Sequence, residues 1–149
     1  MYLVDSSVWF ALAVDLHVHH SIAATWFGTV NTPRAVCFCR STQLSFLRLL
    51  TTTASFSRYG SPALTNDRAW GVYNAFLADE RVHFVSSEPA SLASRWKLFA
   101  GRDTPSPNVW MDAYLAAFAW AGGYQLVTLD RGFRQFEGLD LLLLDASSA

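Results

Sequence analysis

The chain has 149 residues, of which 52% are hydrophobic and only 15% are charged. A chain of this length and apolarity can bury a sizeable core without disulfides or a structural metal, and we expect one domain over residues 1–149. The 11 basic and 12 acidic residues give a formal net charge of −1. This balance excludes a globally basic surface, so a protein that binds nucleic acid would need a local basic patch.

In chain order, the first half predicts a strand at residues 2–4, helices at 8–14 and 20–30, a buried strand at 35–39, a helix at 40–51 capped by Ser41 or Thr42, a loop at 53–62 and a helix at 64–78. The second half predicts a strand at 81–85, a helix at 87–99, a polar loop at 101–107, a strongly apolar helix at 108–121 and buried strands at 125–129 and 141–144. Strands that are continuous apolar runs, alternating with helices, are typical of a parallel sheet covered on both faces. We therefore predict an α/β fold, a three-layer α/β/α sandwich, with ligands bound at the carboxyl ends of the strands.

Composition also bears on the compartment and on partners. The first residues show no basic segment followed by an apolar one, so we expect no signal peptide, and no apolar run is long enough to span a bilayer. The only cysteines, Cys37 and Cys39, would lie about 6.6 Å apart on one side of a strand, which favours reduced thiols and a cytoplasmic protein. The charged fraction falls below the roughly 25% of ordinary soluble domains, so we expect a partner or a second copy to cover apolar surface.

Three aspartates are predicted to meet at one edge of this sheet. Asp5 and Asp130 follow the first and fourth strands directly, and Asp112 lies near the start of the helix that leads into the fourth strand. Two carboxylates roughly 5 Å apart repel by about 3 kcal/mol at an effective dielectric near 20. Either their pKa values rise or a cation lies between them. Oxygen-only ligands favour Mg²⁺ or Mn²⁺ over zinc.

Each aspartate also has an ordinary structural interpretation. Asp5 could cap the following helix, Asp112 could complement a helix dipole, and Asp130 could belong to a strand-exit turn. It is the combination of the three at one edge that indicates a metal site.

The motifs around these residues resemble the PIN-domain family, and within it the VapC-type toxins. The likeness spans nearly the whole chain in the right order, and its blocks are Leu3–Trp9, the weaker Arg40–Leu50, Asp112–Ala117 and Leu126–Phe133. The resemblance implies a Rossmann-like parallel sheet and a Mg²⁺- or Mn²⁺-dependent endoribonuclease, the toxin component of a type II toxin–antitoxin system. It also implies an RNA substrate, a VapB-like antitoxin partner and a homodimer.

By position, the resemblance makes Asp5, Asp112 and Asp130 the catalytic metal ligands. Members of the family usually carry a glutamate early in the helix after the second strand, whereas this chain has Gln43 there and no carboxylate between Arg40 and Asn66. We expect Gln43 to offer a neutral oxygen, which would weaken cation binding.

Side chains near the same edge are further candidates. Ser7 and Thr128 are expected to orient the carboxylates or bound waters. Arginines near the strand exits are expected to hold RNA phosphates, and these are Arg131, Arg134 and Arg40.

Two other functions compete with this interpretation. The first is a degenerate PIN domain that binds RNA or protein without cleaving, which the missing glutamate motivates. The second is a phosphoacceptor receiver domain, which needs an aspartate after its third strand and a lysine after its fifth. Ser86 and Asp145 stand at those places, so the receiver interpretation fails.

Histidines and tryptophans have structural explanations as well. His17, His19 and His20 form a dense group, but without a plausible fourth ligand we interpret them as a helix-start segment rather than a zinc site. Trp9, Trp26 and Trp120 lie in apolar helical stripes and favour core or dimer packing. Trp110, beside Asp112, is the candidate to test for substrate contact.

Overall fold

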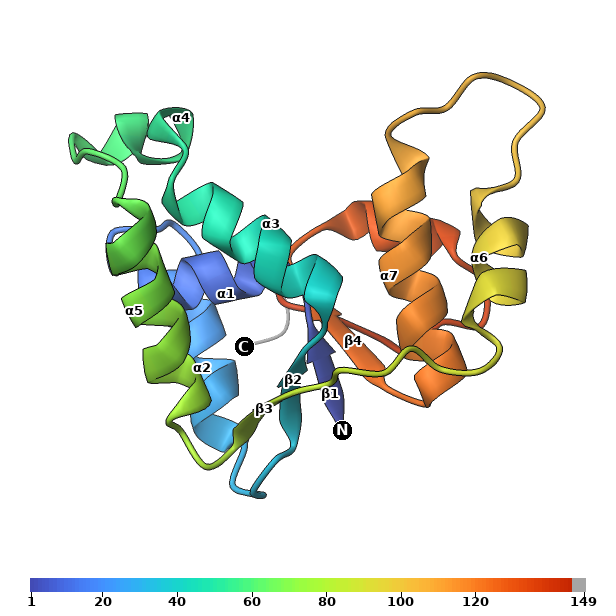
Figure 1. Cartoon of the computed structure of the whole chain (residues 1–149), viewed down its shortest axis with the longest axis horizontal. Coiled ribbons are helices and arrows are strands. Elements are labelled where there is room, and N and C mark those ends of the chain that lie inside the picture. The colour runs from blue at the N-terminus through green and yellow to red at the C-terminus, as the bar shows by residue number, and fades with distance from the viewer. Residues whose placement is uncertain (146–149) are drawn as a thin grey trace.

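Residues 1–145 are described in the computed structural model of the protein. Its strands are short and its helices carry most of the chain (Figure 1). The first half comprises β1 (Tyr2–Val4), α1 (Ser6–Ala13), α2 (His20–Thr29), β2 (Val36–Phe38), α3 (Arg40–Leu50), α4 (Thr53–Phe56), the 3₁₀ helix η1 (Ser57–Tyr59) and α5 (Asn66–Leu77). The second half comprises β3 (Val82–Phe84), α6 (Leu92–Ala100), α7 (Val109–Gly122), β4 (Gln125–Thr128), the 3₁₀ helix η2 (Arg131–Gln135) and β5 (Leu141–Leu143).

The strands form one parallel sheet in the order β3-β2-β1-β4-β5. Its central strand is β1, where Leu3 lies level with Cys37 of β2 and Leu126 of β4. The strand order reverses between β1 and β4, and in open α/β sheets ligands bind beyond the carboxyl ends of the strands at such a point. The predicted parallel α/β fold is confirmed, and the reversal places Asp5 and Asp130 next to each other in the sheet.

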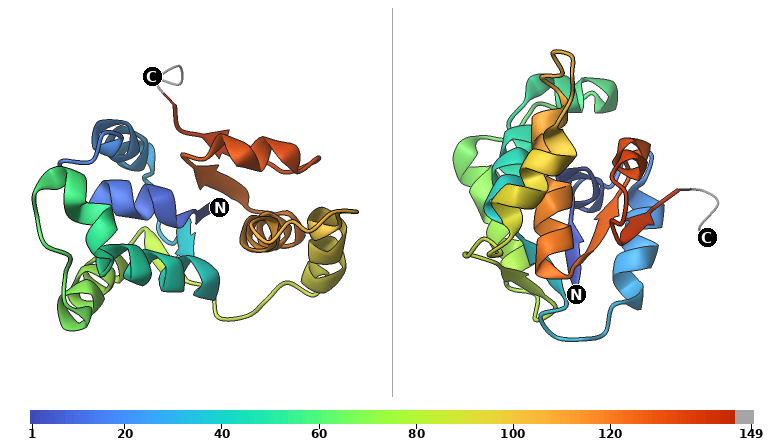
Figure 2. Two further views of the ribbon diagram at one scale, coloured as in Figure 1. Left: turned by 90° about the horizontal axis from the view of Figure 1, so that it is seen from above. Right: turned by 90° about the vertical axis from the view of Figure 1, so that its right-hand side faces the viewer.

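Alternating strand residues supply the two faces of the sheet. One face packs Val4, Phe38 and Val127 against α1, α2, α3 and α5. The other packs Leu3, Leu126 and both cysteines, which are buried and unpaired, against α6 and α7. Figure 2 shows α6 and α7 on one side of the sheet and α1, α3 and α5 on the other. The three-layer arrangement is therefore confirmed, and β1 and β4 are buried between helices.

Two segments differ from the sequence prediction. Residues 53–62, predicted as a loop, contain α4 and η1, because buried Phe56 packs edge-on against Phe10 with ring centroids 5.6 Å apart. The predicted helix at residues 87–99 begins only at Leu92. Pro89 lies ahead of that helix, and its carbonyl accepts a hydrogen bond from the Leu92 backbone N–H. The helix propensities of this Ser- and Thr-rich segment did not predict α4 and η1, because the segment is stabilised by the contact of Phe56 with Phe10.

Smaller differences occur at helix and strand ends. The N-cap of α3 is Cys39, and Thr42 lies in the first turn, where its hydroxyl accepts a hydrogen bond from the Cys39 backbone N–H. The last strand is half-buried rather than buried, because β5 is at the edge of the sheet. Within residues 1–145, every helix is too short or too polar to cross a membrane.

Candidate active site

Asp5 is tied down by hydroxyl groups at the carboxyl end of β1. Ser7 Oγ and Thr128 Oγ1 both donate to Asp5 Oδ2, at 2.6 and 2.7 Å. The Asp5 backbone N–H also donates to the Val127 carbonyl at 2.9 Å. Asp5 is the N-cap residue of α1, but its carboxylate makes no capping hydrogen bond. The ordinary capping interpretation therefore does not account for this side chain, which is oriented across β1 and β4 instead.

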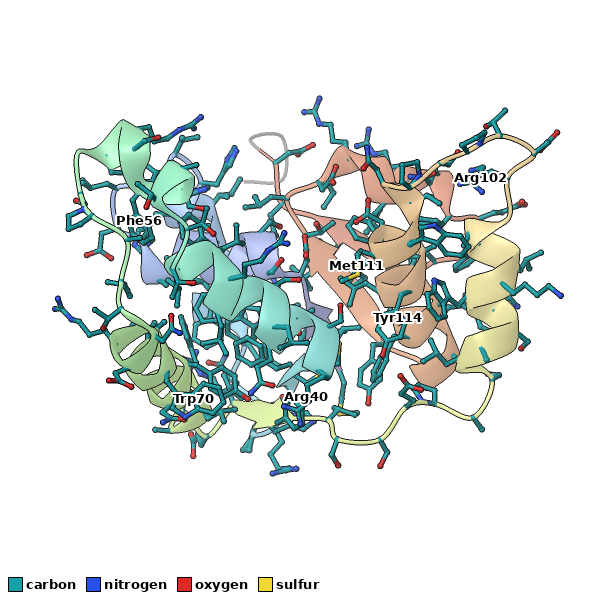
Figure 3. All side chains as sticks on the ribbon, turned by 45° about the horizontal axis from the view of Figure 1, so that its top comes forward. Arg40, Phe56, Trp70, Arg102, Met111 and Tyr114 are labelled. Carbon is teal, nitrogen blue, oxygen red and sulfur yellow. The ribbon has the colours of Figure 1, made fainter. Side chains whose placement is uncertain are left out.

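Asp112 lies in the first turn of α7 and is half-buried. Among residues 1–145, no hydrogen-bond or ion-pair partner faces its carboxylate. Burial raises the pKa of Asp112, and the charges of Asp130 and then Asp5 raise it further. The charges of Asp5 and Asp130 thus act on Asp112, while a shared metal site of the three stays a prediction. Figure 3 shows neighbouring Met111 and Tyr114 on the side of α7 that faces α3.

Asp130 follows β4 and is the most exposed of the three. Its Oδ1 accepts a hydrogen bond of 2.7 Å from the Gly132 backbone N–H in the first turn of η2. Asp130 is thus the N-cap residue of η2. Its own backbone N–H donates to Thr128 Oγ1 at 3.0 Å. The strand-exit interpretation thus accounts for Oδ1 of Asp130, which caps η2. The other carboxylate oxygen, Oδ2, takes no part in this cap. Thr128, with no exposed surface, links Asp130 to Asp5.

The chemistry of these donors fits a hard divalent cation. Carboxylates and hydroxyls are oxygen ligands, and a half-buried carboxylate without a partner beside two others is stabilised by positive charge. Within residues 1–145, no three His, Cys, Asp or Glu side chains converge closely enough to enclose an ion by themselves. Mg²⁺ is commonly held by one or two carboxylates together with waters and substrate phosphate.

Gln43 makes its hydrogen bonds away from the three carboxylates. It is 5% exposed, accepts a hydrogen bond from Arg40 Nη1 on its own helix, and hydrogen-bonds to Tyr73 of α5. The Gln43 side chain is therefore engaged with α3 through its amide oxygen and with Tyr73 of α5. A direct role as a neutral metal ligand stays a prediction, and the contacts seen favour a packing role.

The predicted RNA-binding arginines are exposed but differ in their contacts. Arg131 lies 3.7 Å from the Asp145 carboxylate, and Arg134 lies in the last turn of η2. Arg40, at the start of α3, stacks its guanidinium over the Phe84 ring, 4.6 Å from the centroid. Arg131 and Arg134 lie on η2, which begins immediately after Asp130, whereas Arg40 follows a different strand, β2.

A cavity beside Asp130 includes residues that the sequence did not single out for function. It has a volume of about 530 Å³, and both Ser7 and Asp130 line it. His17, Arg58 and Tyr59 line it as well. The sequence placed these residues in a helix-start segment and a loop, and no local motif connects them. The histidines belong to no metal-binding group within the described residues, and His19 is the N-cap residue of α2, as the helix-start interpretation predicted.

Residues 2–139 match the PIN-domain family model. The chain belongs to the PIN-domain family. It is 51% identical over 144 residues to Ribonuclease VapC41 of Mycobacterium tuberculosis, which covers 97% of this chain and 99% of that relative. It is 33% identical over 139 residues to Ribonuclease VapC29 of the same organism, with 91% and 90% covered.

Solved PIN-domain toxins share the fold of this chain. VapC20 of Mycobacterium tuberculosis, described as a sarcin–ricin loop cleaving toxin, superposes with a TM-score of 0.61 at 21% identity, covering 94% of this chain and 98% of that one. The VapBC-1 structure from nontypeable Haemophilus influenzae gives a TM-score of 0.67 at 14% identity, with 96% and 97% covered. At these identities the likeness establishes the PIN fold alone.

Proposed function

We propose that this protein is a Mg²⁺- or Mn²⁺-dependent endoribonuclease, the toxin of a type II toxin–antitoxin pair. The observation that carries the proposal is the half-buried carboxylate of Asp112, which lacks a partner among the described residues and whose pKa is raised by burial, Asp130 and Asp5. The 51% identity to a ribonuclease over nearly the whole chain supports the same activity. PIN-domain ribonucleases generally depend on a divalent metal.

The side chains at this edge have distinct tasks in the proposed reaction. Asp112 and Asp5 hold the cation, and Asp130 contributes its free oxygen directly or through water. Ser7 and Thr128 keep Asp5 in place through their hydroxyl groups. When bound, the cation polarises the scissile phosphate and lowers the pKa of the attacking water.

The substrate's phosphates are held separately from the reacting centre. Arg131 and Arg134, which follow Asp130 along η2, bind the RNA backbone beside the carboxylates. Arg40 is a less direct candidate, because its guanidinium already contacts Phe84 and Gln43. Since the chain has no overall positive charge, this local contribution and the cation together offset the repulsion between RNA and the acidic edge.

Cleavage of total cellular RNA by the purified protein tests the proposal. With Mg²⁺ or Mn²⁺ we expect discrete products that EDTA abolishes, and Asp112→Asn should reduce cleavage by more than about 100-fold, since cation stabilisation of the transition state is worth several kcal/mol. Asp67→Asn is the matched control, because Asp67 occupies the first turn of α5 and is exposed. Cleavage that survives in Asp112→Asn would remove this residue from the site.

A PIN domain that binds RNA without cleaving is the second candidate, and the engagement of Gln43 with Arg40 and Tyr73 is the observation that favours it. The glutamate that the family usually carries after the second strand is absent from this chain, and in this candidate Gln43 does not take its place beside the three aspartates. The same RNA experiment separates the two candidates. Metal-dependent turnover excludes the non-cleaving one, whereas RNA binding without products under either metal excludes the nuclease.

A VapB-like antitoxin and a second copy of the chain are the proposed protein partners. Solved structures with the same fold include VapBC-1 of Haemophilus influenzae and VapBC2 of Rickettsia felis bound to a DNA fragment from their promoter. In this chain, large apolar side chains on several elements are more than half exposed, among them Leu16, Val18, Leu98, Trp110 and Met111. Such surface is typical of proteins that are covered by a partner.

A further inference from the structure

The cavity beside Asp130 is a second binding feature of the molecule. Its lining comes from several separate parts of the chain, among them Phe10 of α1, the segment around His17, and Arg58 and Tyr59 of η1. Because Ser7 and Asp130 line it too, the cavity opens directly onto the carboxylate edge.

Several aromatic rings line the cavity, together with aliphatic and polar side chains. The His17 ring lies 5.7 Å from the Phe10 ring, nearly perpendicular to it, and 6.2 Å from the Tyr59 ring. Sequence-selective proteins bind single-stranded RNA by stacking splayed bases on Phe, Tyr, His or Arg side chains. A volume of about 530 Å³ lies within the range of small-ligand sites.

The side of the cavity formed by η1 is held in place. Phe56 is buried against Phe10 immediately before η1, and Figure 3 shows it at the base of α4. The Leu64 backbone N–H donates to the Leu50 carbonyl at 2.9 Å, so the excursion through α4 and η1 is closed at its ends. Gly60 ends η1 with φ of +64°. Tyr59 and Arg58 are thus presented by a closed segment.

Charge also distinguishes this cavity from an ordinary apolar pocket. Arg58 is exposed and has no hydrogen-bond or ion-pair partner among residues 1–145. Burial and then the charges of His19, Arg58 and His20 lower the pKa of His17, and Arg58 and His17 line the same cavity. A guanidinium without such a partner, beside aromatic rings, complements a nucleotide, whose base is aromatic and whose phosphate is anionic.

We propose that this cavity binds a nucleobase of single-stranded RNA next to the scissile phosphate, with Tyr59 and His17 stacking on the base and Arg58 contacting the adjoining phosphate. The inference rests on the proposed ribonuclease function and extends it to the substrate, which would be an unpaired RNA segment. A base held here would set the sequence preference of cleavage through its contacts at one position.

The test uses the full-length Asp112→Asn protein with a fluorescein-labelled, mixed-sequence single-stranded RNA 12-mer. Tyr59→Ala should weaken binding by about tenfold, the usual loss for one stacked base, whereas Tyr59→Phe keeps the ring and should bind like the parent. Arg58→Ala should lower the slope of log Kd against log salt concentration by about 0.7, the value for one phosphate contact on a single strand. Arg68→Ala, an exposed arginine on α5, is the matched control and should change neither quantity.

Photo-crosslinking locates the base without relying on any variant. The same 12-mer carrying 5-iodouridine should crosslink to peptides containing Phe10–His19 or Ser55–Tyr59. Crosslinks confined to other peptides, together with unchanged affinity in Tyr59→Ala and Arg58→Ala, would overturn the inference while wild-type cleavage of total RNA kept the proposed function. Loss of antitoxin binding but not of RNA binding in these variants would show that the cavity takes a protein side chain instead. Absence of both cleavage and RNA binding would refute both proposals.

Discussion

At the amino end of β3, Asp79 lies beside Arg81, whereas at the opposite end of the sheet Asp112 lies beside Asp5 and Asp130. Arg81 donates from Nε and Nη2 to the two oxygens of Asp79, at 2.9 and 2.6 Å, and these hydrogen bonds lower the pKa of Asp79 to about 2. The pKa of Asp112 instead moves upward. At one end of the sheet the Asp79 carboxylate is paired with a positive charge. At the other end the Asp112 carboxylate is influenced by two further negative charges.

The difference separates stabilising charges from functional ones. Arg81 also donates to the Phe27 and Val30 carbonyls and stacks over the Phe27 ring at 3.9 Å, so it ties the end of α2 to β3. Nothing comparable offsets the charge of Asp112 within the described residues. Carboxylates that raise one another's pKa cost stability unless a cation joins them, which is why such groups mark candidate sites.

The largest effect on stability is expected where the paired end is broken. Arg81→Ala removes a bidentate ion pair and two hydrogen bonds to carbonyls, and should lower the free energy of unfolding by about 2–3 kcal/mol. Asp79 has a folded pKa below its unfolded value of 3.8. The ion pair therefore contributes fully above that value and is lost as the pH falls through about 2. Urea denaturation between pH 2 and 7 measures the loss of stability in Arg81→Ala and its dependence on pH. A stability difference between wild type and Arg81→Ala that stays constant with pH would contradict the ion-pair explanation.

An intermediate effect is expected at Thr128, which holds the acidic end together. Thr128→Val should cost about 1–2 kcal/mol of stability, because Asp5 loses a donor and the Asp130 N–H loses its acceptor, and should reduce cleavage by roughly tenfold. Thr42→Val is the matched control, since Thr42 is equally buried and bonds to Cys39 on α3. It should cost stability without a comparable loss of cleavage. Equal losses of cleavage in the two variants would show that Thr128 acts only through the fold.

The smallest effect has the opposite sign. Without metal at pH 7, Asp112→Asn should raise the melting temperature by a few degrees, about 1 kcal/mol, because it removes a charge that the folded protein disfavours. Since the folded pKa of Asp112 lies above 3.8, the wild-type protein gains stability as the pH falls through that folded pKa. The stability advantage of Asp112→Asn over the wild type therefore vanishes below pH 3.8, the pKa of Asp112 in the unfolded chain. Asp67→Asn should instead lower stability slightly through the helix dipole, and thermal scans at pH 3.5 and 7 distinguish the two.

Much of this organisation could be predicted from the sequence because strong local signals coincide. Buried strands read as apolar runs, and Asp5 and Asp130 follow two of them directly, so the topology alone brings them together. The cavity walls could not be predicted in this way. Tyr59 and Arg58 depend on the contact between Phe56 and Phe10, and Gln43 on its partners Arg40 and Tyr73, which are contacts between distant segments without a local pattern.

The pairing of β1 with β4 has a consequence for synthesis of the chain. Asp5 and Thr128, which hydrogen-bond directly, are 123 residues apart. Such a contact closes a loop of 123 residues, and pairing across so long a separation slows folding. A nascent chain on the ribosome that ends before Gln125 has neither Thr128 nor Asp130, and its Asp5 has no neighbouring strand on that side. The acidic edge is therefore completed only after Thr128 and Asp130 have been synthesised, and fragments that end before them lack it.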